Sequence, residues 1–271
     1  MIQDLKHIIY NTVIEANRKM TPGEVEKAVA GAAGIDRKTV KLAIKDLVSR
    51  GELGYTYLYG ASFLEMSFDR PVRLSKRIVI KPPERAYQSQ PGGVVVDIAG
   101  GAAFGNGAHP TTSLALKALD FVLSNNRRTE TTAPLKGLDM GTGTGVLAIA
   151  MAKLGVREVL GLDIDPCAIS EAANNIRLND LTEQVAVSGM ALEQVRTCFS
   201  VIVANLAYPT LRRLAPLFSA KMEKAGVLIL SGFKGSASKD LMEAYSEHGF
   251  SVIREEMDLQ WVCLVLRDHQ T

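Results

Sequence analysis

The chain has 271 residues, of which 47% are hydrophobic and 22% charged, and its formal net charge is +2. This composition is typical of a globular protein, and no apolar run approaches the roughly 18 residues that a membrane-spanning helix needs. The N-terminal residues contain an acid and no small-residue cleavage site, so we expect no export signal and a cytoplasmic location. The length favours two domains.

The three cysteines and the charge distribution indicate which kinds of site and partner to expect. Cys167, Cys198 and Cys263 are far apart and form no C-x-x-C pair. The spacing therefore indicates neither a disulfide framework nor a metal site, and we expect three buried thiols. Basic residues outnumber acidic ones over residues 1–90, and the reverse holds over 91–271. The N-terminal part is thus the part expected to meet an anionic partner.

The N-terminal region has the signals of three short helices and a hairpin. Thr21, Pro22 and Glu24 are spaced as a capping box with proline at the first helical position, and Asp36 can cap the next helix. Aromatic-rich stretches flank Gly60 and indicate a hairpin. The expected helices cover 5–16, 21–30 and 37–50, and the expected strands 53–59 and 62–68.

Three helices followed by a hairpin predict a winged-helix-like module over residues 1–70. Lys38, Lys41 and Lys45 recur at steps of three and four, so they share the outer face of its third helix. Two interpretations of these lysines remain open. One is a solvated or protein-docking face, and the other is a nucleic-acid contact.

Proline-rich and glycine-rich residues over 71–93 predict a domain junction, which leaves 94–271 as the second domain. Within the junction, residues 77–81 have a strand pattern and are expected to pack against the second domain. Strand and helix patterns alternate through this domain, which predicts an α/β fold with a mostly parallel sheet covered by helices on both faces. The expected helices cover 114–123, 146–154, 168–178, 211–222 and 239–248, and the expected strands 137–140, 158–163, 184–188, 201–204, 227–231, 251–255 and 262–266.

A glycine-rich turn after the first of these strands is the predicted cofactor site. Gly141, Gly143 and Gly145 follow Asp139 and open a helix, but Val146 stands where a dinucleotide-binding fingerprint has glycine. The pattern therefore favours a ligand without pyrophosphate. S-adenosyl-L-methionine fits, because its carboxylate can bind free N–H groups at the helix start while Asp139 faces its ammonium.

The next strand ends at Asp163, at the distance where an acid binds ribose hydroxyls. We assign this cofactor role to Asp163. Asp165 directly precedes Pro166 and is assigned a capping role. Ile164 and Met190 are expected to flank the adenine ring, because the segment around Met190 offers no acid for the exocyclic amine.

Several motifs in order resemble the bacterial methyltransferases that modify ribosomal protein L11. They cover 101–112, 139–145, 163–166, 203–206, 230–232 and 261–266. The resemblance extends over residues 76–271 and does not include residues 1–70. It implies a seven-stranded, Rossmann-like class I methyltransferase domain and methylation of protein amino groups. It also implies that Thr112, Gly141, Asp163 and Asn205 are cofactor-site positions. Asn106 and Ala108 depart from the family pattern, which usually has threonine there.

Four residues are candidates for catalytic or binding roles near the reacting groups. Asn205, at the end of a strand, can orient an acceptor N–H, or it can simply form a turn. His109 can act in catalysis, or it can cap the helix after Pro110. Phe104 can close over the cofactor or only pack, and Tyr208 can line the acceptor channel or only pack.

The sequence thus predicts an S-adenosylmethionine-dependent enzyme that methylates nitrogen on a protein, recognised with help from the N-terminal module. Two alternatives remain open. One is a cofactor-sensing DNA-binding regulator, and the other is a methyltransferase for a small molecule or nucleobase. The acceptor atom, the number of methyl groups transferred and the oligomeric state are left open.

Overall fold

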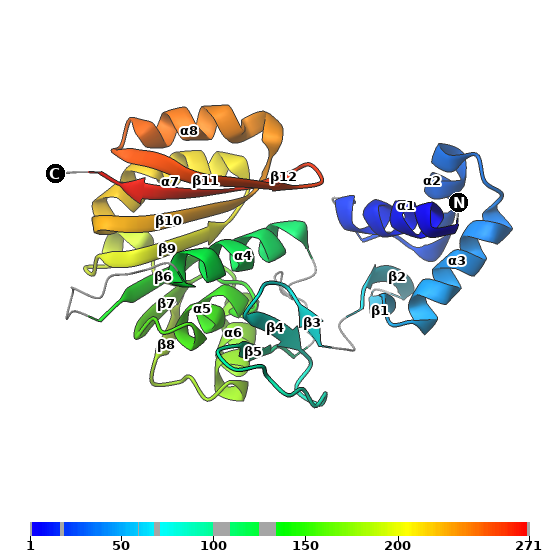
Figure 1. The fold of residues 1–271 in the computed structure, drawn as a ribbon, viewed down its shortest axis with the longest axis horizontal. Coiled ribbons are helices and arrows are strands. Elements are labelled where there is room, and N and C mark those ends of the chain that lie inside the picture. Colours follow the sequence, from blue (N-terminus) through cyan, green and yellow to red (C-terminus); the bar gives the residue numbers. More distant parts are fainter. Residues whose placement is uncertain are drawn as a thin grey trace. The chain divides into compact units, whose positions relative to one another are not determined.

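The computed structural model describes residues 2–16, 19–58, 60–67, 71–99, 109–124 and 134–269 (Figure 1). The chain divides into two compact units, Met1–Pro71 and Val72–Thr271. None of the helices in these ranges is long and apolar enough to cross a membrane.

The first unit contains three helices and a two-stranded hairpin. The capping box is formed as expected, with the Glu24 carboxylate accepting from the Thr21 N–H at 2.8 Å. Asp36 caps the third helix by accepting from the Thr39 N–H at 2.9 Å. The elements are α1 (Ile2–Glu15), α2 (Pro22–Ala33), α3 (Arg37–Ser49), β1 (Leu53–Leu58) and β2 (Ala61–Met66).

A separate core holds this unit together. β1 and β2 pair antiparallel, and Met20, between α1 and α2, adds a bridge to Leu64 of β2. One face of each element is buried, and each buried aliphatic side chain contributes roughly 1.5–3 kcal/mol. The buried core residues are Leu5, Ile9, Val25, Val29, Val40, Ala43, Ile44, Leu47, Leu53 and Leu64.

The second unit is built on a seven-stranded sheet with the strand order β11-β12-β10-β9-β6-β7-β8. β6 pairs in parallel with β7 on one side and β9 on the other, so the strand order reverses at β6. Only the edge around β12 is antiparallel. The strands are β6 (Lys136–Met140), β7 (Glu158–Leu162), β8 (Val185–Ser188), β9 (Phe199–Asn205), β10 (Met222–Lys234), β11 (Phe250–Asp258) and β12 (Trp261–Asp268). This arrangement is the Rossmann-like α/β methyltransferase fold expected from the sequence.

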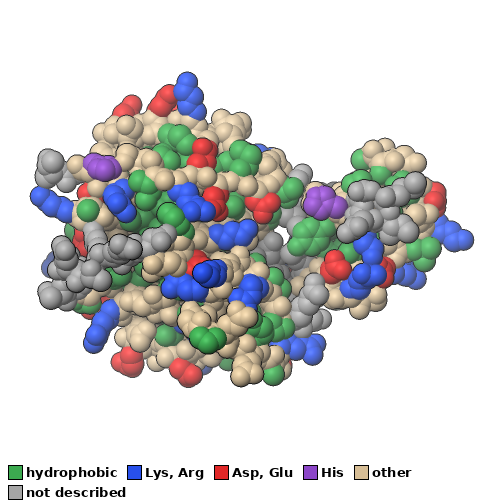
Figure 2. Space-filling model, in the orientation of Figure 1, with side chains coloured by type: hydrophobic (Ala, Val, Ile, Leu, Met, Phe, Trp, Pro, Cys, Tyr) green, Lys and Arg blue, Asp and Glu red, His purple; other side chains and the backbone are tan. Residues whose placement is uncertain are grey.

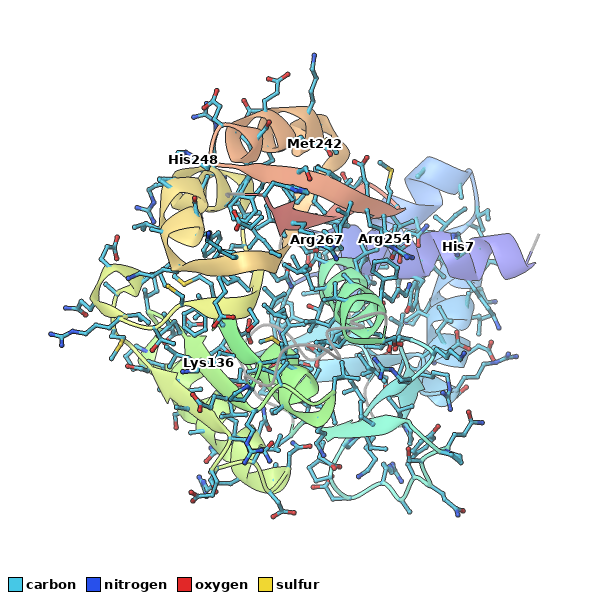
Figure 3. All side chains as sticks on the ribbon, turned by 60° about the vertical axis from the view of Figure 1, so that its left-hand side comes forward. His7, Lys136, Met242, His248, Arg254 and Arg267 are labelled. Atoms are coloured by element: carbon cyan, nitrogen blue, oxygen red, sulfur yellow. The ribbon has the colours of Figure 1, made fainter. Side chains whose placement is uncertain are left out.

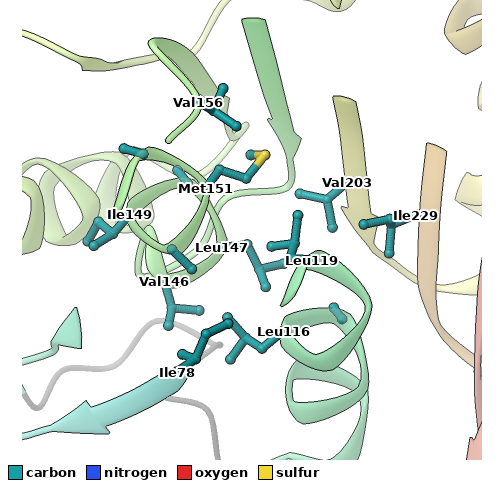
Figure 4. Close-up of a cluster of buried hydrophobic side chains, with 14 of the residues drawn as sticks. Ile78, Leu116, Leu119, Val146, Leu147, Ile149, Met151, Val156, Val203 and Ile229 are labelled. Atoms are coloured by element: carbon teal, nitrogen blue, oxygen red, sulfur yellow. The ribbon is translucent and has the colours of Figure 1, made fainter. Parts of the chain in front are cut away.

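Helices cover both faces of this sheet. Alternate residues of β9 face opposite sides, with Val201 and Val203 in one core and Ile202 and Ala204 in the other. Figure 4 shows the first core, where α4 and α5 meet the sheet. The second core lies under α7 and α8. The helices are α4 (Pro110–Ser124), α5 (Val146–Lys153), α6 (Pro166–Leu178), α7 (Tyr208–Lys221) and α8 (Ser238–Ser246).

The segment 71–93, expected as a junction, carries regular structure of its own. β3 (Val72–Arg73) and β4 (Ile78–Lys81) form a small sheet with β5 (Val94–Asp97), in which β4 and β5 are parallel. Ile78 and Ile80 are buried in the same core as α4 and α5. Because their side chains complete that core, β3 and β4 belong to the second unit.

The expectation of three buried cysteines is wrong for two of them. Cys263 is buried in β12, but Cys167 and Cys198 are exposed. Cys167 lies in the first turn of α6, and Cys198 directly precedes β9. Cys167 is not among the buried residues of α6, and Cys198 lies outside β9, so both thiols meet solvent.

Candidate functional site

The predicted cofactor residues meet at the carboxyl ends of β6 and β7. Gly141, Gly143 and Gly145 have φ values of 75°, 55° and 82°, a left-handed conformation that side chains rarely adopt. A Cβ on Gly141 would also lie 2.4 Å from a methyl carbon of Leu206. The turn therefore favours glycine for its backbone conformation, and a side chain at Gly141 would also displace the Leu206 side chain.

Asp139 lies beneath this turn and is completely buried. Its Oδ2 accepts from the Thr142 hydroxyl at 2.7 Å and from the Ala148 N–H at 3.0 Å. Its Oδ1 has no partner among the described residues. Burial raises the pKa of this carboxyl to about 7, although the bonds from Thr142 and Ala148 oppose the rise. One oxygen thus stabilises the turn, and the other remains as an acceptor that fits a donor such as an ammonium group.

Asp163 is held beside the glycine turn at the end of β7. Its Oδ2 accepts from the Gly143 N–H at 2.9 Å, and its Oδ1 accepts from the Asp165 N–H at 3.0 Å. Asp165 in turn caps α6 by accepting from the Cys167 N–H at 2.8 Å. The two acids therefore lie where the sequence places them, with Asp165 in the capping arrangement and Asp163 against the turn.

Two exposed apolar side chains follow the neighbouring ends of β7 and β8. Ile164 is 93% exposed and Met190 is 45% exposed. The strand ends are paired, because the Asp163 N–H donates to the Ser188 carbonyl at 3.2 Å. An apolar surface beside a carboxylate fits a nucleoside, whose ring needs apolar cover and whose ribose hydroxyls need an acceptor.

Asn205 and Thr112 meet on the other side of β6. The Asn205 amide donates to the Thr112 hydroxyl at 3.2 Å, while its Oδ1 is buried and unpartnered among the described residues. The Ser231 hydroxyl, on β10, donates to the Thr111 carbonyl at 2.9 Å. These bonds fix the N-terminus of α4 over the ends of β9 and β10. They also leave a second orphaned acceptor, which fits an N–H donor.

His109 makes the contacts of a helix cap. Its Nδ1 lies 2.8 Å from the Thr111 hydroxyl and accepts from the Thr111 N–H, so α4 begins at Pro110 and not at Leu114. The ring packs edge-on against Trp261 at 4.9 Å, and burial lowers the pKa of His109. A catalytic role for His109 stays a prediction.

Tyr208 makes contacts that the sequence did not indicate. Its hydroxyl donates to Asp240 at 2.8 Å, and Asp240 also accepts from Arg212 at 3.0 Å. The bond to Asp240 raises the pKa of Tyr208. A position in the acceptor channel stays a prediction, because the hydroxyl is directed at α8. Phe104 lies outside the described residues.

Two features of the site go beyond the predicted site residues. Gly232 belongs to the 230–232 motif and lies inside β10, where the pairing with β12 is irregular between Leu230 and Phe233. Its φ is 95°, and a Cβ there would lie 2.4 Å from the Leu206 carbonyl oxygen. Asn175 of α6 contacts the glycine turn. A glycine inside a buried strand was a usable signal for the first. A buried asparagine on an otherwise apolar helix face was a weak one for the second.

A surface cavity lies at the opposite end of β6 from the glycine turn. A cavity of about 270 Å³ is lined by Lys136, Glu158 and Phe199, which begin β6, β7 and β9. Lys136, labelled in Figure 3, marks this amino end of β6, and the glycine turn follows the opposite end. The residues in the described ranges contain no acid, histidine or cysteine cluster that could hold a metal ion.

Comparison with known proteins agrees with this geometry. Residues 65–269 match the model of the family "Ribosomal protein L11 methyltransferase (PrmA)". A relative from Geobacter sp. (strain M21), named ribosomal protein L11 methyltransferase, is 39% identical over 198 residues, which are 73% of this chain and 63% of the relative. One of the same name from Halalkalibacterium halodurans is 35% identical over 201 residues, 73% of this chain and 61% of the relative.

A solved structure gives the same result for the fold. The ribosomal protein L11 methylase from Lactobacillus delbrueckii subsp. bulgaricus superposes with a TM-score of 0.64 and 30% identity, covering 73% of this chain and 99% of that one. The chain spans less than two thirds of the length of the curated relatives named above. From the family match over 65–269 and these relatives, the chain belongs to the ribosomal protein L11 methyltransferase family.

Proposed function

We propose that this protein transfers a methyl group from S-adenosyl-L-methionine, the cofactor of this methyltransferase family, to an amino nitrogen of a protein. The observation that carries the proposal is the pair of unpartnered buried acceptors, Asp139 Oδ1 and Asn205 Oδ1, at the carboxyl ends of adjacent strands. One acceptor fits the ammonium of the cofactor, and the other fits the N–H of an amine.

The residues around the glycine turn would each bind a different part of the cofactor. The N–H groups of Val146 and Leu147, which begin α5, would bind its carboxylate, as helix N-termini generally bind anions. Asp163 would accept from the ribose hydroxyls in place of its present backbone donors, and Ile164 and Met190 would cover the adenine. When bound, the cofactor supplies a sulfonium methyl group, and the nitrogen–carbon bond forms as the carbon–sulfur bond breaks with its electron pair moving to sulfur.

Asn205 would orient the acceptor on the opposite side. An amide is a neutral acceptor, so it can align an N–H but cannot remove a proton at neutral pH. The main contribution of the protein is therefore alignment and exclusion of water, and loss of water also favours the neutral amine over the ammonium. The relatives carry the name of a ribosomal protein, and we propose a ribosomal protein as the substrate class.

We propose that the N-terminal unit is a winged-helix-like adaptor for that substrate. Three helices, a hairpin and the Met20–Leu64 bridge support this assignment. Lys38, Lys41 and Lys45 of α3 are exposed and make no ion pair with any described residue. Other basic residues of the unit do pair, among them Lys6 with Asp46, Arg37 with Glu26 and Arg50 with Asp46.

The outer face of α3 is therefore a row of uncompensated positive charge around Leu42, which is 59% exposed. On the second unit, Figure 2 shows basic and acidic side chains interspersed over the visible face. The α3 face is suited to an anionic partner. DNA binding by a cofactor-sensing regulator is the second candidate function that this face supports.

The two candidates are separated by labelling. Purified protein is incubated with radiolabelled S-adenosylmethionine and host-cell lysate, and the product is treated with protease or nuclease. We expect label that protease removes and nuclease leaves. Lys41→Glu should lower the labelling rate, whereas Lys27→Glu, an equal charge reversal on the exposed face of α2, should not. Label lost only to nuclease, or no label at all, would contradict the protein-methylation proposal.

A further inference from the structure

The helix after Asp163 carries two buried asparagines one turn apart. Asn175 of α6 and Asn179, which caps the C-terminus of that helix, are only 2% and 6% exposed. Buried amides are costly unless they are hydrogen-bonded, so each must have a partner in the fold. Both find their partners in the backbone of other segments.

Asn179 binds the strand beside it. Its Oδ1 accepts from the Asp97 N–H at 2.9 Å, and its amide donates to the Asp97 carbonyl at 2.7 Å. Asp97 is the last residue of β5, so this side chain acts on β5 as a neighbouring strand would. A second bond from the same amide goes to the Asn175 carbonyl within α6.

Asn175 instead bridges two separate segments. Its Oδ1 accepts from the Ala99 N–H at 3.0 Å, just beyond β5, and its Nδ2 donates to the Thr144 carbonyl at 2.9 Å. Thr144 lies between Gly143 and Gly145 in the cofactor turn. One turn earlier on the same helix, Ala172 packs so closely that a Cβ on Gly145 would lie 3.2 Å from its Cβ.

The neighbouring glycine explains why such a bond is needed. The Thr144 carbonyl and the Gly145 N–H belong to one peptide, whose plane is set by ψ of Thr144 and φ of Gly145. Gly145 has no side chain to restrict its angle, so hydrogen bonds help to fix this plane, and the Gly145 N–H donates to the Thr142 carbonyl at 2.8 Å. Fixing the carbonyl against α6 therefore fixes the plane of the peptide at the entrance to α5.

We propose that Asn175 is a positioning residue for cofactor binding, which holds the Thr144 peptide in the orientation that the cofactor requires, while Asn179 only anchors β5. The inference rests on the proposed function of the glycine turn as the S-adenosylmethionine site. It predicts that two similarly buried asparagines on one helix affect the protein differently. Loss of either lowers stability, but only loss of Asn175 lowers cofactor affinity.

The test measures S-adenosylmethionine affinity by calorimetry for the full chain and for Asn175→Ala, with Asn179→Ala as the matched control. Asn175→Ala should raise the Kd about tenfold, the effect of one lost buried hydrogen bond. Asn179→Ala should leave the Kd within about twofold while lowering the urea midpoint. Equal affinities of wild type and Asn175→Ala, or equal losses in both variants, would overturn the proposal. If wild type itself bound no cofactor, the proposed function would fail instead.

Asn175→Asp adds a measurement whose result would not change with pH if Asn175 had only a structural role. The carboxylate can still accept from Ala99, but it cannot donate to Thr144 and repels that carbonyl. Below its pKa, the protonated acid can donate again. Relative to wild type at each pH, the affinity of Asn175→Asp should therefore recover as the pH falls, and that of Asn175→Ala should not. This pH profile of the affinity tests the proposal even if Asn175→Ala does not fold. An affinity of Asn175→Asp that does not change with pH relative to wild type would overturn the proposal.

Discussion

Replacing Asp139 by asparagine should stabilise the protein at high pH. Burial raises the pKa of this carboxyl from 3.8 to about 7. The folded protein thus holds the proton more tightly than the unfolded chain, and stability from this group falls as the pH rises from about 4 to about 7. At about 1.36 kcal/mol for each pKa unit, ionisation of Asp139 costs the fold on the order of 4 kcal/mol at pH 8. The asparagine oxygen can still accept from Thr142 and Ala148, so the variant loses the charge and keeps the bonds.

Urea unfolding of both proteins at pH 5 and pH 8 measures this cost. The gain in unfolding free energy of Asp139→Asn over wild type should be larger at pH 8 than at pH 5 by about 2 to 3 kcal/mol. Asp36→Asn is the control, because the bond from Thr39 lowers the pKa of that exposed carboxyl. Its contribution is lost only as the pH falls through that lowered value, so its effect should be the same at pH 5 and pH 8. A gain for Asp139→Asn that does not change with pH would refute the reasoning.

The same substitution should weaken cofactor binding. Oδ1 of Asp139 is the unpartnered acceptor proposed for the cofactor ammonium. A nearby cation favours the ionised carboxylate, so wild-type affinity for S-adenosylmethionine should rise as the pH increases from 6 to 7. In Asp139→Asn, calorimetry should show lower affinity and no such rise. Asp139 would then lower the free energy of unfolding and also contribute to cofactor binding.

Two further pairs of substitutions test the acids and the glycines around the site. Asp163→Ala should weaken S-adenosylmethionine binding by a few kcal/mol in calorimetry, the usual cost of losing a charge-assisted bond, whereas Asp165→Ala should cost only about 1 kcal/mol of stability as a lost helix cap. Gly232→Ala should lower the unfolding free energy by more than 2 kcal/mol, because its Cβ would meet the Leu206 backbone. Gly155→Ala, with a φ of 104° and open space around the added Cβ, should cost about 1 kcal/mol.

Local signals account for the parts of the fold that the sequence predicts well. The caps at Thr21 and Asp36 depend on residues within one turn, so they could be located before any packing was known. Within 71–97 the strand pattern at 77–81 is visible in the sequence, but β3 and β5 could not be separated from a linker in this way. The pairing of β4 with β5 crosses an intervening proline- and glycine-containing stretch, and Ile78 reaches a core formed by helices much later in the chain.

The same distinction explains which site residues could be found. Asp139 and Asp163 are recognisable because a strand end followed by a glycine turn fixes where an acid lies. Other contacts around the site come from far along the chain: Thr112 bonds Asn205 across 93 residues, and Asn175 bonds Ala99 across 76. No periodicity encodes such pairs. Asp139 and Asn205 lie near the carboxyl ends of the paired strands β6 and β9, and the long-range bond from Asn205 to Thr112 orients the second of these two acceptors.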